Sequence, residues 1–308
     1  MKAAVCARYG PPEVLQFQDV DDPVPGARDV LIRIRATTVT PSDCYIRSMI
    51  PSAPLAKRLM ARAAIGFTRP RRSILGAVLA GEIEAIGRKV TRFRVCDRVW
   101  AFTTLRMGCY AQRTRLPATL KLLTPAPSNL SHDDAAAVLG GWMALYFLGK
   151  ANIRSGQRVL VYGASGANGA SAVQFAKHLG ADVTAVCSTA NVEMLRSLGA
   201  DTVLDYTKDP ASALGRYDVV FDAVGRRKTS PIKDAARNAL TTAGKFISVD
   251  DRLPRFRRDD LIQLKELAEA GKLKPVIDRR YPLERTAEAH QYVEQGHKKG
   301  NVVITIGD

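Results

Sequence analysis

The stretch Arg158-Val-Leu-Val-Tyr-Gly-Ala-Ser-Gly-Ala-Asn-Gly169 decides the fold of this chain. An apolar run typical of a strand leads into three glycines at Gly163, Gly166 and Gly169, and a helical pattern begins at Ala170. Glycines at this spacing permit a tight turn and a close approach of the backbone to a pyrophosphate, which then lies at the positive end of the helix. The pattern therefore predicts a turn that binds the phosphates of a dinucleotide.

The alternation of strand and helix continues after this turn. Further strands are predicted at 182–188, 202–206, 218–224 and 245–249. Strands that alternate with helices form a parallel sheet covered on both faces. A glycine triplet alone is a weak signal, but its place between a strand and a helix of such a series favours a Rossmann nucleotide-binding domain. The alternative is a strand–helix turn in an α/β protein that binds no nucleotide.

The beginning of the chain is β-rich instead. Strands are predicted at 1–8, 29–36, 81–87 and 98–102, with Pro and Gly in the turns between several of them. A helix should start at Ser131, and the tail from about Leu261 alternates helix, strand, helix, strand, so that it could rejoin the first domain. We predict an α/β protein with a doubly wound parallel sheet at 126–265 and a second, β-rich domain made of 1–125 and 266–308.

The end of the strand at 182–188 bears on the choice of cofactor. A site for NADH usually has Asp or Glu there to bind the ribose 2′-hydroxyl, but no acid precedes Glu193. The small hydroxyl side chains of Ser188 and Thr189 leave room for a 2′-phosphate. The sequence thus favours NADPH, with NADH as the alternative. These two residues could instead only cap the next helix.

The composition is that of an ordinary globular protein with an unusual charge. The chain has 308 residues, 46% of them hydrophobic, and a formal net charge of +16, which favours anionic partners. No apolar run approaches the length of a membrane span, and the start resembles no secretory signal. The five scattered cysteines suggest reduced thiols rather than a disulfide framework, so we expect a cytoplasmic protein.

Several further segments resemble a known family. They are Thr37–Arg47, Leu75–Gly87, Leu198–Tyr206, Tyr217–Gly225 and the ending Gly300–Ile304. Together with the glycine turn they resemble the zinc-independent quinone oxidoreductase branch of the medium-chain dehydrogenase/reductase superfamily, over nearly the whole chain. The resemblance implies a GroES-like substrate domain folded from both chain ends and a Rossmann domain between them. It also implies NADPH-dependent hydride transfer to a quinone or an activated enone.

The zinc alcohol dehydrogenases of the same superfamily are the nearest competitor. They have a Gly-His-Glu near the second of these segments, where this chain has Gly76-Ala-Val78, and all four histidines lie elsewhere. Zinc needs three or four convergent ligands, so we expect none. Hydride addition to a quinone leaves a phenolate, whose parent acid has a pKa of about 10, and addition to an enone leaves a delocalised enolate. Ordinary hydrogen bonds can stabilise both, at about 3 kcal/mol per donor in the transition state.

The resemblance assigns roles in the substrate segment. Tyr45 matches a tyrosine that could donate a hydrogen bond to the substrate carbonyl, or could equally be a packing aromatic. Thr40 stands where relatives often have Asn, at the nicotinamide or substrate. Asp43 is the third catalytic candidate, although Asp43 and Arg47 are expected to fix the loop by an ion pair rather than to act in catalysis.

The resemblance also assigns cofactor contacts. Tyr206 matches a tyrosine beside the adenosine phosphate, whereas Asn191 stands where some relatives have Lys, and Asn168 replaces a small apolar residue. The amide of Asn168 could bind a phosphate or disturb helix packing. The full predicted set of cofactor-binding residues is Gly163, Ala164, Ser165, Gly166, Ala167, Asn168, Gly169, Ser188, Thr189, Asn191, Tyr206 and Val224.

Two segments depart from the family pattern. Residues 250–260 are short where relatives usually have a further strand at the dimer edge, so a homodimer would have an altered edge. Residues 51–72 form a basic insertion with a helical segment at 56–67. This helix could be a lid over the substrate, a peripheral contact with anionic lipid, or only a solvated surface helix.

Two other functions stay open. One is a zinc-independent alcohol dehydrogenase or carbonyl reductase. The other is a non-catalytic protein on the same fold that binds RNA or a membrane surface through its positive charge. A nucleic-acid partner is not favoured, because the chain lacks motifs that combine aromatic and basic residues.

Overall fold

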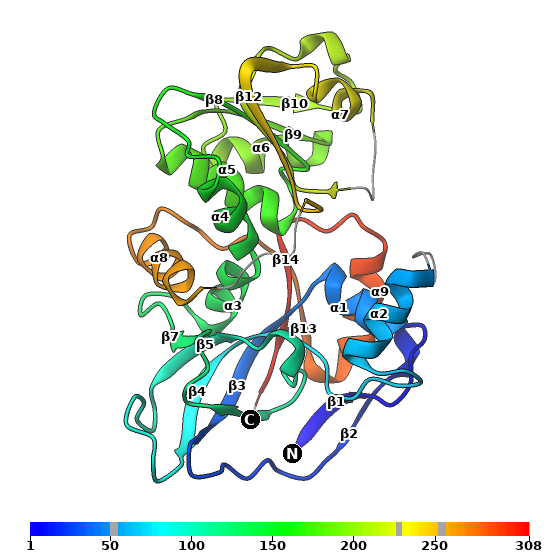
Figure 1. Cartoon of the computed structure of the whole chain (residues 1–308), viewed down its shortest axis with the longest axis vertical. Helices are drawn as coiled ribbons and strands as arrows, with labels where there is room; N and C mark the ends of the chain where they lie inside the picture. Colours follow the sequence, from blue (N-terminus) through cyan, green and yellow to red (C-terminus); the bar gives the residue numbers. More distant parts are fainter. Residues whose placement is uncertain (50–54, 226–229, 252–256, 308) are drawn as a thin grey trace. The chain divides into compact units, whose positions relative to one another are not determined.

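The computed structural model describes residues 1–49, 55–225, 230–251 and 257–307. These residues form two compact units (Figure 1). The terminal unit consists of Met1–Leu139 and Ile277–Asp308, and the central unit consists of Gly140–Val276. Both chain ends therefore belong to one unit, and the middle of the chain forms the other.

The central unit is built on a parallel sheet with the strand order β10-β9-β8-β11-β12 in the described part of the chain. The strands are β8 (Arg158–Tyr162), β9 (Asp182–Cys187), β10 (Thr202–Asp205), β11 (Tyr217–Asp222) and β12 (Leu240–Ser248). Nearly every residue of β8 and β9 is buried in succession, as expected for strands covered on both faces. The strand order reverses at β8, which is the switch point of a doubly wound sheet. The predicted Rossmann domain is confirmed.

The helices of the central unit cover this sheet. They are α4 (Trp142–Gly149), α5 (Ala167–His178), α6 (Val192–Ser197), α7 (Pro231–Ala236) and α8 (Arg258–Glu269). In α8, Leu261, Leu264 and Leu267 are buried at helical spacing, and the helix contacts α4. The buried amide of Gln174 on α5 anchors the segment after α8 by accepting from the Lys274 amide (2.7 Å) and donating to its carbonyl (3.1 Å).

The terminal unit contains a mixed sheet with the order β13-β14-β3-β4-β5-β7, in which β6 also pairs with β3. Its strands are β3 (Asp29–Val39), β4 (Val78–Ile86), β5 (Arg98–Phe102), β6 (Arg113–Pro117), β7 (Leu123–Pro125), β13 (Ile277–Pro282) and β14 (Asn301–Thr305), and a separate pair is formed by β1 (Lys2–Cys6) and β2 (Leu15–Asp19). Its helices are α1 (Pro41–Ser48), α2 (Leu55–Ile65), α3 (His132–Gly140) and α9 (Thr286–Glu294).

The tail of the chain completes the terminal unit. Strand β14, at the red end of the chain in Figure 1, pairs antiparallel with β3 and parallel with β13. Alternating residues of these strands, such as Ile32, Ile34, Val302 and Ile304, are fully buried in one core. The GroES-like domain that the resemblance implied, assembled from both chain ends, is confirmed.

The junctions between the units lie further along the chain than the predicted boundaries at 125/126 and 265/266. Helix α3 belongs to the terminal unit because Asp133 accepts hydrogen bonds from Arg280 (2.8 Å) and Thr305 (3.1 Å), and His132 contacts Glu82 (3.2 Å). The first helix of the tail, α8, belongs to the central unit. These ties join segments distant in sequence, so a local pattern does not reveal them.

The structure also bears on three smaller predictions about single elements. Helix α3 begins with the predicted Ser131 cap, whose hydroxyl accepts from the Asp134 amide (3.1 Å). Strand β12 starts at Leu240 rather than 245. Much of the shortened 250–260 segment lies outside the described residues, so the missing strand and the altered dimer edge stay predictions. Strand β12 is the outermost strand on that side of the described sheet.

Among the described residues, we find no helix that is both long and apolar enough to cross a bilayer.

Candidate active site

The glycine turn is the most constrained part of the central unit. Gly163 has a φ of +72°, and a Cβ there would collide with the Cγ2 atom of Val224. A Cβ on Gly169 would collide with the Gly163 carbonyl oxygen and lie 2.6 Å from the Cα atom of Ala164. The first glycine thus supplies a backbone conformation that other residues rarely adopt, and the third lets α5 pack directly on the turn.

Helix α5 begins earlier than the sequence predicted. It starts at Ala167 rather than Ala170, so that Asn168 and Gly169 lie in its first turn. Gly166 is the N-cap, and no side chain caps the helix. Backbone N–H groups at an uncapped N-terminus are available to an anion, and the helix dipole favours negative charge there. The turn, the switch point and the uncapped helix therefore fit the pyrophosphate of a dinucleotide.

Asn168 packs towards α4 in this structure. Its amide nitrogen donates to the sulfur of Met143 at 3.8 Å, and its Oδ1 atom is buried without a partner among the described residues. A buried amide oxygen without a hydrogen bond is costly, so this site favours a ligand or water that can donate to it. Helix α5 is continuous through Asn168, and phosphate binding by this amide stays a prediction.

The residues predicted to bind the adenosine end gather after β9 and β10. The Ser188 hydroxyl accepts from the Asn191 amide (3.1 Å), and Ser188 makes no side-chain capping bond. Asn191 is buried, and its Oδ1 atom has no partner in the described part of the chain. Tyr206 is 40% exposed, and its backbone N–H is bound to Cys187 (3.0 Å). The structure therefore brings Ser188 and Asn191 together and leaves the Tyr206 ring accessible.

Asp205 is a neighbour of these residues that the sequence analysis did not single out. It is the last residue of β10 and is buried. The Thr189 hydroxyl donates to one of its oxygens, and the amide (2.9 Å) and hydroxyl (2.6 Å) of Thr207 donate to the other. Burial alone would raise the pKa of Asp205, but these hydrogen bonds lower it below its usual value. Thr189 is thus fixed by a carboxylate, not by a helix cap.

A second acid, Asp222, lies at the end of β11 and was also missed. It is buried and accepts from the amides of Val224 (3.1 Å) and Gly225 (3.0 Å). Lys233 on α7 forms an ion pair with it at 3.1 Å. This network fixes Val224 against Gly163. The sequence did contain a signal for Asp205 and Asp222, because each stands at the end of a strand. The carboxyl ends of parallel strands meet at one edge of a sheet, where ligands bind.

In the terminal unit, Thr40 and Asp43 cap helix α1. The Asp43 carboxylate accepts from the Thr40 amide (2.8 Å) and from its hydroxyl (2.5 Å), and the Asp43 amide donates to the Thr40 hydroxyl (3.3 Å). This is a capping box, which satisfies two otherwise unpaired donors. Burial raises the pKa of Asp43 to about 6, although the hydrogen bonds from Thr40 oppose the shift. Both residues therefore fix the start of the helix that carries Tyr45.

The expected ion pair between Asp43 and Arg47 is wrong. Arg47 is fully buried and forms its ion pair with Glu294 on α9 instead, which holds α1 and α9 together. The Nε and Nη1 atoms of Arg47 have no partner among the described residues. Tyr45 lies on the partly exposed side of the same helix. Arg47 thus has a structural role, as predicted, but through a residue distant in sequence.

The potential metal donors of the terminal unit do not form a zinc site. Cys44 is buried, its thiol is directed at the His290 carbonyl oxygen (3.8 Å), and burial raises its pKa strongly. The His290 ring is fully buried against the Tyr110 hydroxyl (3.2 Å), and burial lowers its pKa to about 3. Within the described residues, no three His, Cys, Asp or Glu side chains lie together as metal ligands would. The donor set therefore does not fit a catalytic zinc.

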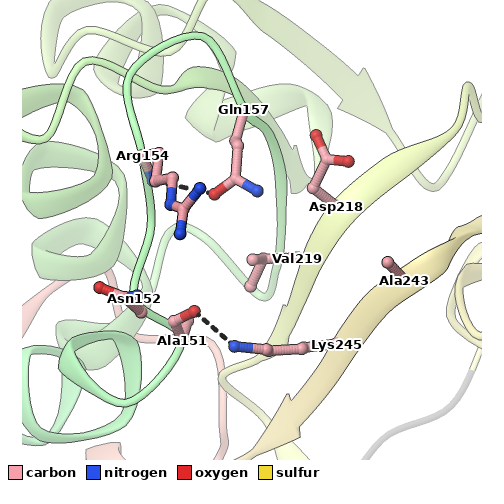
Figure 2. Close-up of a pocket in the computed structure, with 8 residues that line it drawn as sticks. All are labelled: Ala151, Asn152, Arg154, Gln157, Asp218, Val219, Ala243 and Lys245. Carbon is pink, nitrogen blue, oxygen red and sulfur yellow. Dashed lines mark hydrogen bonds between the residues drawn. The ribbon is translucent and has the colours of Figure 1, made fainter.

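Two hollows of the central unit lie apart from the predicted residues. Figure 2 shows a polar pocket of about 150 Å³, where Lys245 donates to the Ala151 carbonyl (3.0 Å) and the Arg154 amide to Gln157 (2.9 Å). A basic groove of about 370 Å³ is lined in part by Lys177, Lys272 and Lys274. Neither contains a residue of the glycine turn or of the adenosine end, so neither is the predicted site.

Comparisons with known proteins agree with this geometry. Residues 26–152 match a family described as the alcohol dehydrogenase GroES-like domain, and residues 168–268 and 249–304 match two families described as zinc-binding dehydrogenases. An NADPH-dependent alkenal/one oxidoreductase from chloroplasts of Arabidopsis thaliana is 31% identical, over 99% of this chain and 79% of its own. A quinone oxidoreductase from Pseudomonas aeruginosa is 28% identical, over 97% of both chains. The structure of the quinone oxidoreductase from Coxiella burnetii superposes with a TM-score of 0.81 and 25% identity, over 100% of this chain and 99% of that one.

We predict that Gly169→Ala lowers the free energy of unfolding by about 1–3 kcal/mol, because the new methyl group overlaps backbone atoms that cannot move aside. Gly149→Ala is the matched control, since a Cβ at this position of α4 meets no atom within 4 Å. The control should be neutral or slightly stabilising. Urea denaturation measures both, and equal effects of the two substitutions would contradict the close packing of α5 on the turn.

We also predict a pH dependence that belongs to Asp43. Its pKa is about 6 in the folded protein and about 3.9 when unfolded, so its contribution to stability is present below pH 4 and is lost as the pH rises through 6. The loss should be about 3 kcal/mol, at 1.36 kcal/mol per pKa unit. Asp43→Asn should remove this dependence. The unfolding free energies of the original protein and of Asp43→Asn are compared at pH 4 and at pH 7, which cancels the contributions of the other titrating groups. A difference between the two proteins that is the same at both pH values would refute the prediction.

Proposed function

Because the chain belongs to the medium-chain dehydrogenase/reductase superfamily, we propose that it is an NADPH-dependent reductase that transfers hydride to a quinone or an activated enone without a metal ion. The observation that carries this proposal is the cradle made by Gly163, Gly169 and the uncapped start of α5. Side chains at these glycines would collide with Val224 and with the backbone of Gly163 and Ala164, and so would displace the start of α5 from the turn.

The residues of the central unit fit a nicotinamide dinucleotide. The backbone between Ala164 and Asn168 would hold the pyrophosphate, and Ser188, Asn191 and Tyr206 would surround the adenosine. Val224, fixed by the Asp222 network, would border the turn from the other side. When bound, the reduced cofactor supplies the hydride. The protein itself would bind the cofactor, orient it and limit the access of water.

NADPH is the preferred cofactor in this proposal. No acid stands at the end of β9, and Ser188 and Thr189 offer hydroxyl groups in its place. The one buried acid nearby, Asp205, already receives hydrogen bonds from Thr189 and Thr207, so it has less capacity left to accept from a ribose hydroxyl. Several relatives are named as NADPH- or NAD(P)H-dependent oxidoreductases, which supports the same choice.

The proposed class of hydride acceptor rests on the names of the relatives and on the acidity of the reduced product. The named relatives act on alkenals, alkenones or quinones. Reduction of these acceptors leaves negative charge on an oxygen whose conjugate acid is far stronger than a simple alcohol, so hydrogen bonds are enough to stabilise it. Tyr45 on α1 is the proposed donor, oriented by the Thr40–Asp43 capping box. A cytoplasmic location remains part of this proposal.

Alcohol oxidation without zinc is the second candidate, because residues 26–152 match the family described as the alcohol dehydrogenase GroES-like domain. It uses the same cofactor site and differs in the direction and the substrate. Oxidation of simple alcohols with NADP⁺ faster than the reduction of any quinone or enone would favour it over the first proposal.

Titration with NADPH and with NADH, followed by the fluorescence of the bound nicotinamide, tests the cofactor site. We expect NADPH to bind at least tenfold more tightly, and the bound cofactor to be oxidised when a quinone or an enone is added. Binding without oxidation by any member of either acceptor class would refute the reductase. Absence of binding by both nucleotides would refute the cofactor site itself.

Tyr45→Phe tests the proposed donor. Loss of one hydrogen bond to the developing oxyanion should reduce kcat/KM by about 10²–10³-fold and leave the Kd for NADPH unchanged. Tyr292→Phe is the matched control, because this tyrosine belongs to the same unit and its hydroxyl bonds to Asp278 (2.6 Å). Equal activities of the two variants would remove Tyr45 from the mechanism.

A further inference from the structure

The distribution of charge along the chain is uneven. From Cys44 to Gly81 there is no Asp or Glu, whereas seven basic residues occur: Arg47, Lys57, Arg58, Arg62, Arg69, Arg71 and Arg72. This single segment therefore carries +7 of the formal net charge of +16. It includes helix α2 and the turn that follows it, which belong to the terminal unit (Figure 1).

Helix α2 turns an apolar face to the solvent. Leu59 is 50% exposed, Met60 is 74% exposed and Phe67, just after the helix, is 59% exposed. Ala63 and Ala64 are also exposed, and they follow Leu59 and Met60 at i+4 on the same side of the helix. On the other side Ile65 packs against the core. A surface helix normally exposes its polar face, whereas α2 exposes Leu59 and Met60.

Three exposed arginines follow this apolar stretch in the sequence, and hydrogen bonds hold the turn that leads to them. The Tyr9 hydroxyl donates to the Gly66 carbonyl (2.8 Å) and the Arg71 amide donates to the Ile65 carbonyl (2.7 Å), which hold the turn after α2. Arg69, Arg71 and Arg72 are exposed, and we find no ion pair for any of them among the described residues. Exposed apolar side chains and exposed arginines without an ion pair therefore occur within one short stretch of the chain, residues 59–72.

We propose that this α2 surface, made of Leu59, Met60, Phe67, Arg69, Arg71 and Arg72, binds the headgroup region of an anionic phospholipid bilayer. An interfacial helix buries its apolar face at the boundary of headgroups and acyl chains, and adjacent basic residues contact the lipid phosphates. The planar guanidinium group suits phosphate contacts particularly well. The helix lies on the membrane and does not cross it.

The combination of groups favours this occupant over others. A soluble polyanion would use the three arginines but would leave Leu59, Met60 and Phe67 in water. A second protein chain could cover the apolar side chains, but it would then have to offer acidic groups to Arg69, Arg71 and Arg72 as well. A bilayer with anionic headgroups supplies both environments at once. The inference concerns location and is independent of the proposed reduction, because its test measures binding alone.

Cosedimentation with phospholipid vesicles tests the proposal. The full chain should bind vesicles of phosphatidylcholine that contain phosphatidylglycerol, bind vesicles of phosphatidylcholine alone far more weakly, and dissociate as the salt concentration rises. Replacing Arg69, Arg71 and Arg72 by Gln should weaken binding about a hundredfold. The matched control replaces Arg28, Arg88 and Arg94, three exposed arginines elsewhere in the terminal unit, and should change binding less than a few-fold.

A second set of variants tests the apolar part. The triple variant Leu59→Ala, Met60→Ala and Phe67→Ala should lose at least tenfold in vesicle affinity and keep its thermal stability. Val24→Ala with Leu105→Ala is the control, because these side chains are 75% and 58% exposed outside the α2 surface. In Met60→Trp, the emission of the new tryptophan should shift to the blue when anionic vesicles are added.

Several results would overturn the proposal. One is equal binding to the two kinds of vesicle, and another is unchanged binding by both triple variants. Tight binding to heparin without binding to vesicles would assign the surface to soluble polyanions. A change of sedimentation coefficient in the Leu59, Met60 and Phe67 variant, without lipid binding by the original chain, would assign it to a contact between two copies.

Discussion

The contact on which the central unit depends is the one between the backbone of Gly163–Ala164 and the first turn of α5 at Gly169. It exists only because Gly169 has no Cβ. The short approach places the start of α5 directly over the end of β8, at the strand where the sheet order reverses. Val224, held by Asp222, closes the turn from the neighbouring strand. The shape of the glycine turn is therefore a result of packing between three elements and not of the glycines alone.

The terminal unit fixes both ends of the short helix α1, which bears Tyr45. Helix α1 is fixed at its start by hydrogen bonds between Thr40 and Asp43, and near its end by the buried ion pair of Arg47 with Glu294. A buried guanidinium with a single charged partner is costly to form, and removal of that partner is costlier still. The position of Tyr45 between these two anchors depends on both, and the second comes from the last helix of the chain.

The sequence was most informative where structure depends on neighbouring residues. The glycine turn, most strands of the parallel sheet and the Ser131 cap follow from local patterns and were predicted correctly, whereas β12 begins at Leu240 rather than at residue 245. The start of α5 was misplaced by three residues, because Asn168 and Gly169 are poor helix formers that packing holds in place. The partner of Arg47 could not be predicted, since Glu294 lies 247 positions away. Asp205 and Asp222 were missed because their importance depends on where strands end in space.

The position of β14 has a consequence for the synthesis of the protein. This strand is made after β3 and after the whole central unit, yet it lies inside the sheet, between β3 and β13. The early strands of the terminal unit therefore emerge from the ribosome long before a neighbour that completes their core. The central unit is continuous in sequence and can fold as soon as it has been made. Until β14 has been made, the edge of β3 that it will occupy is an unpaired strand edge, which exposes the nascent chain to non-native strand pairing.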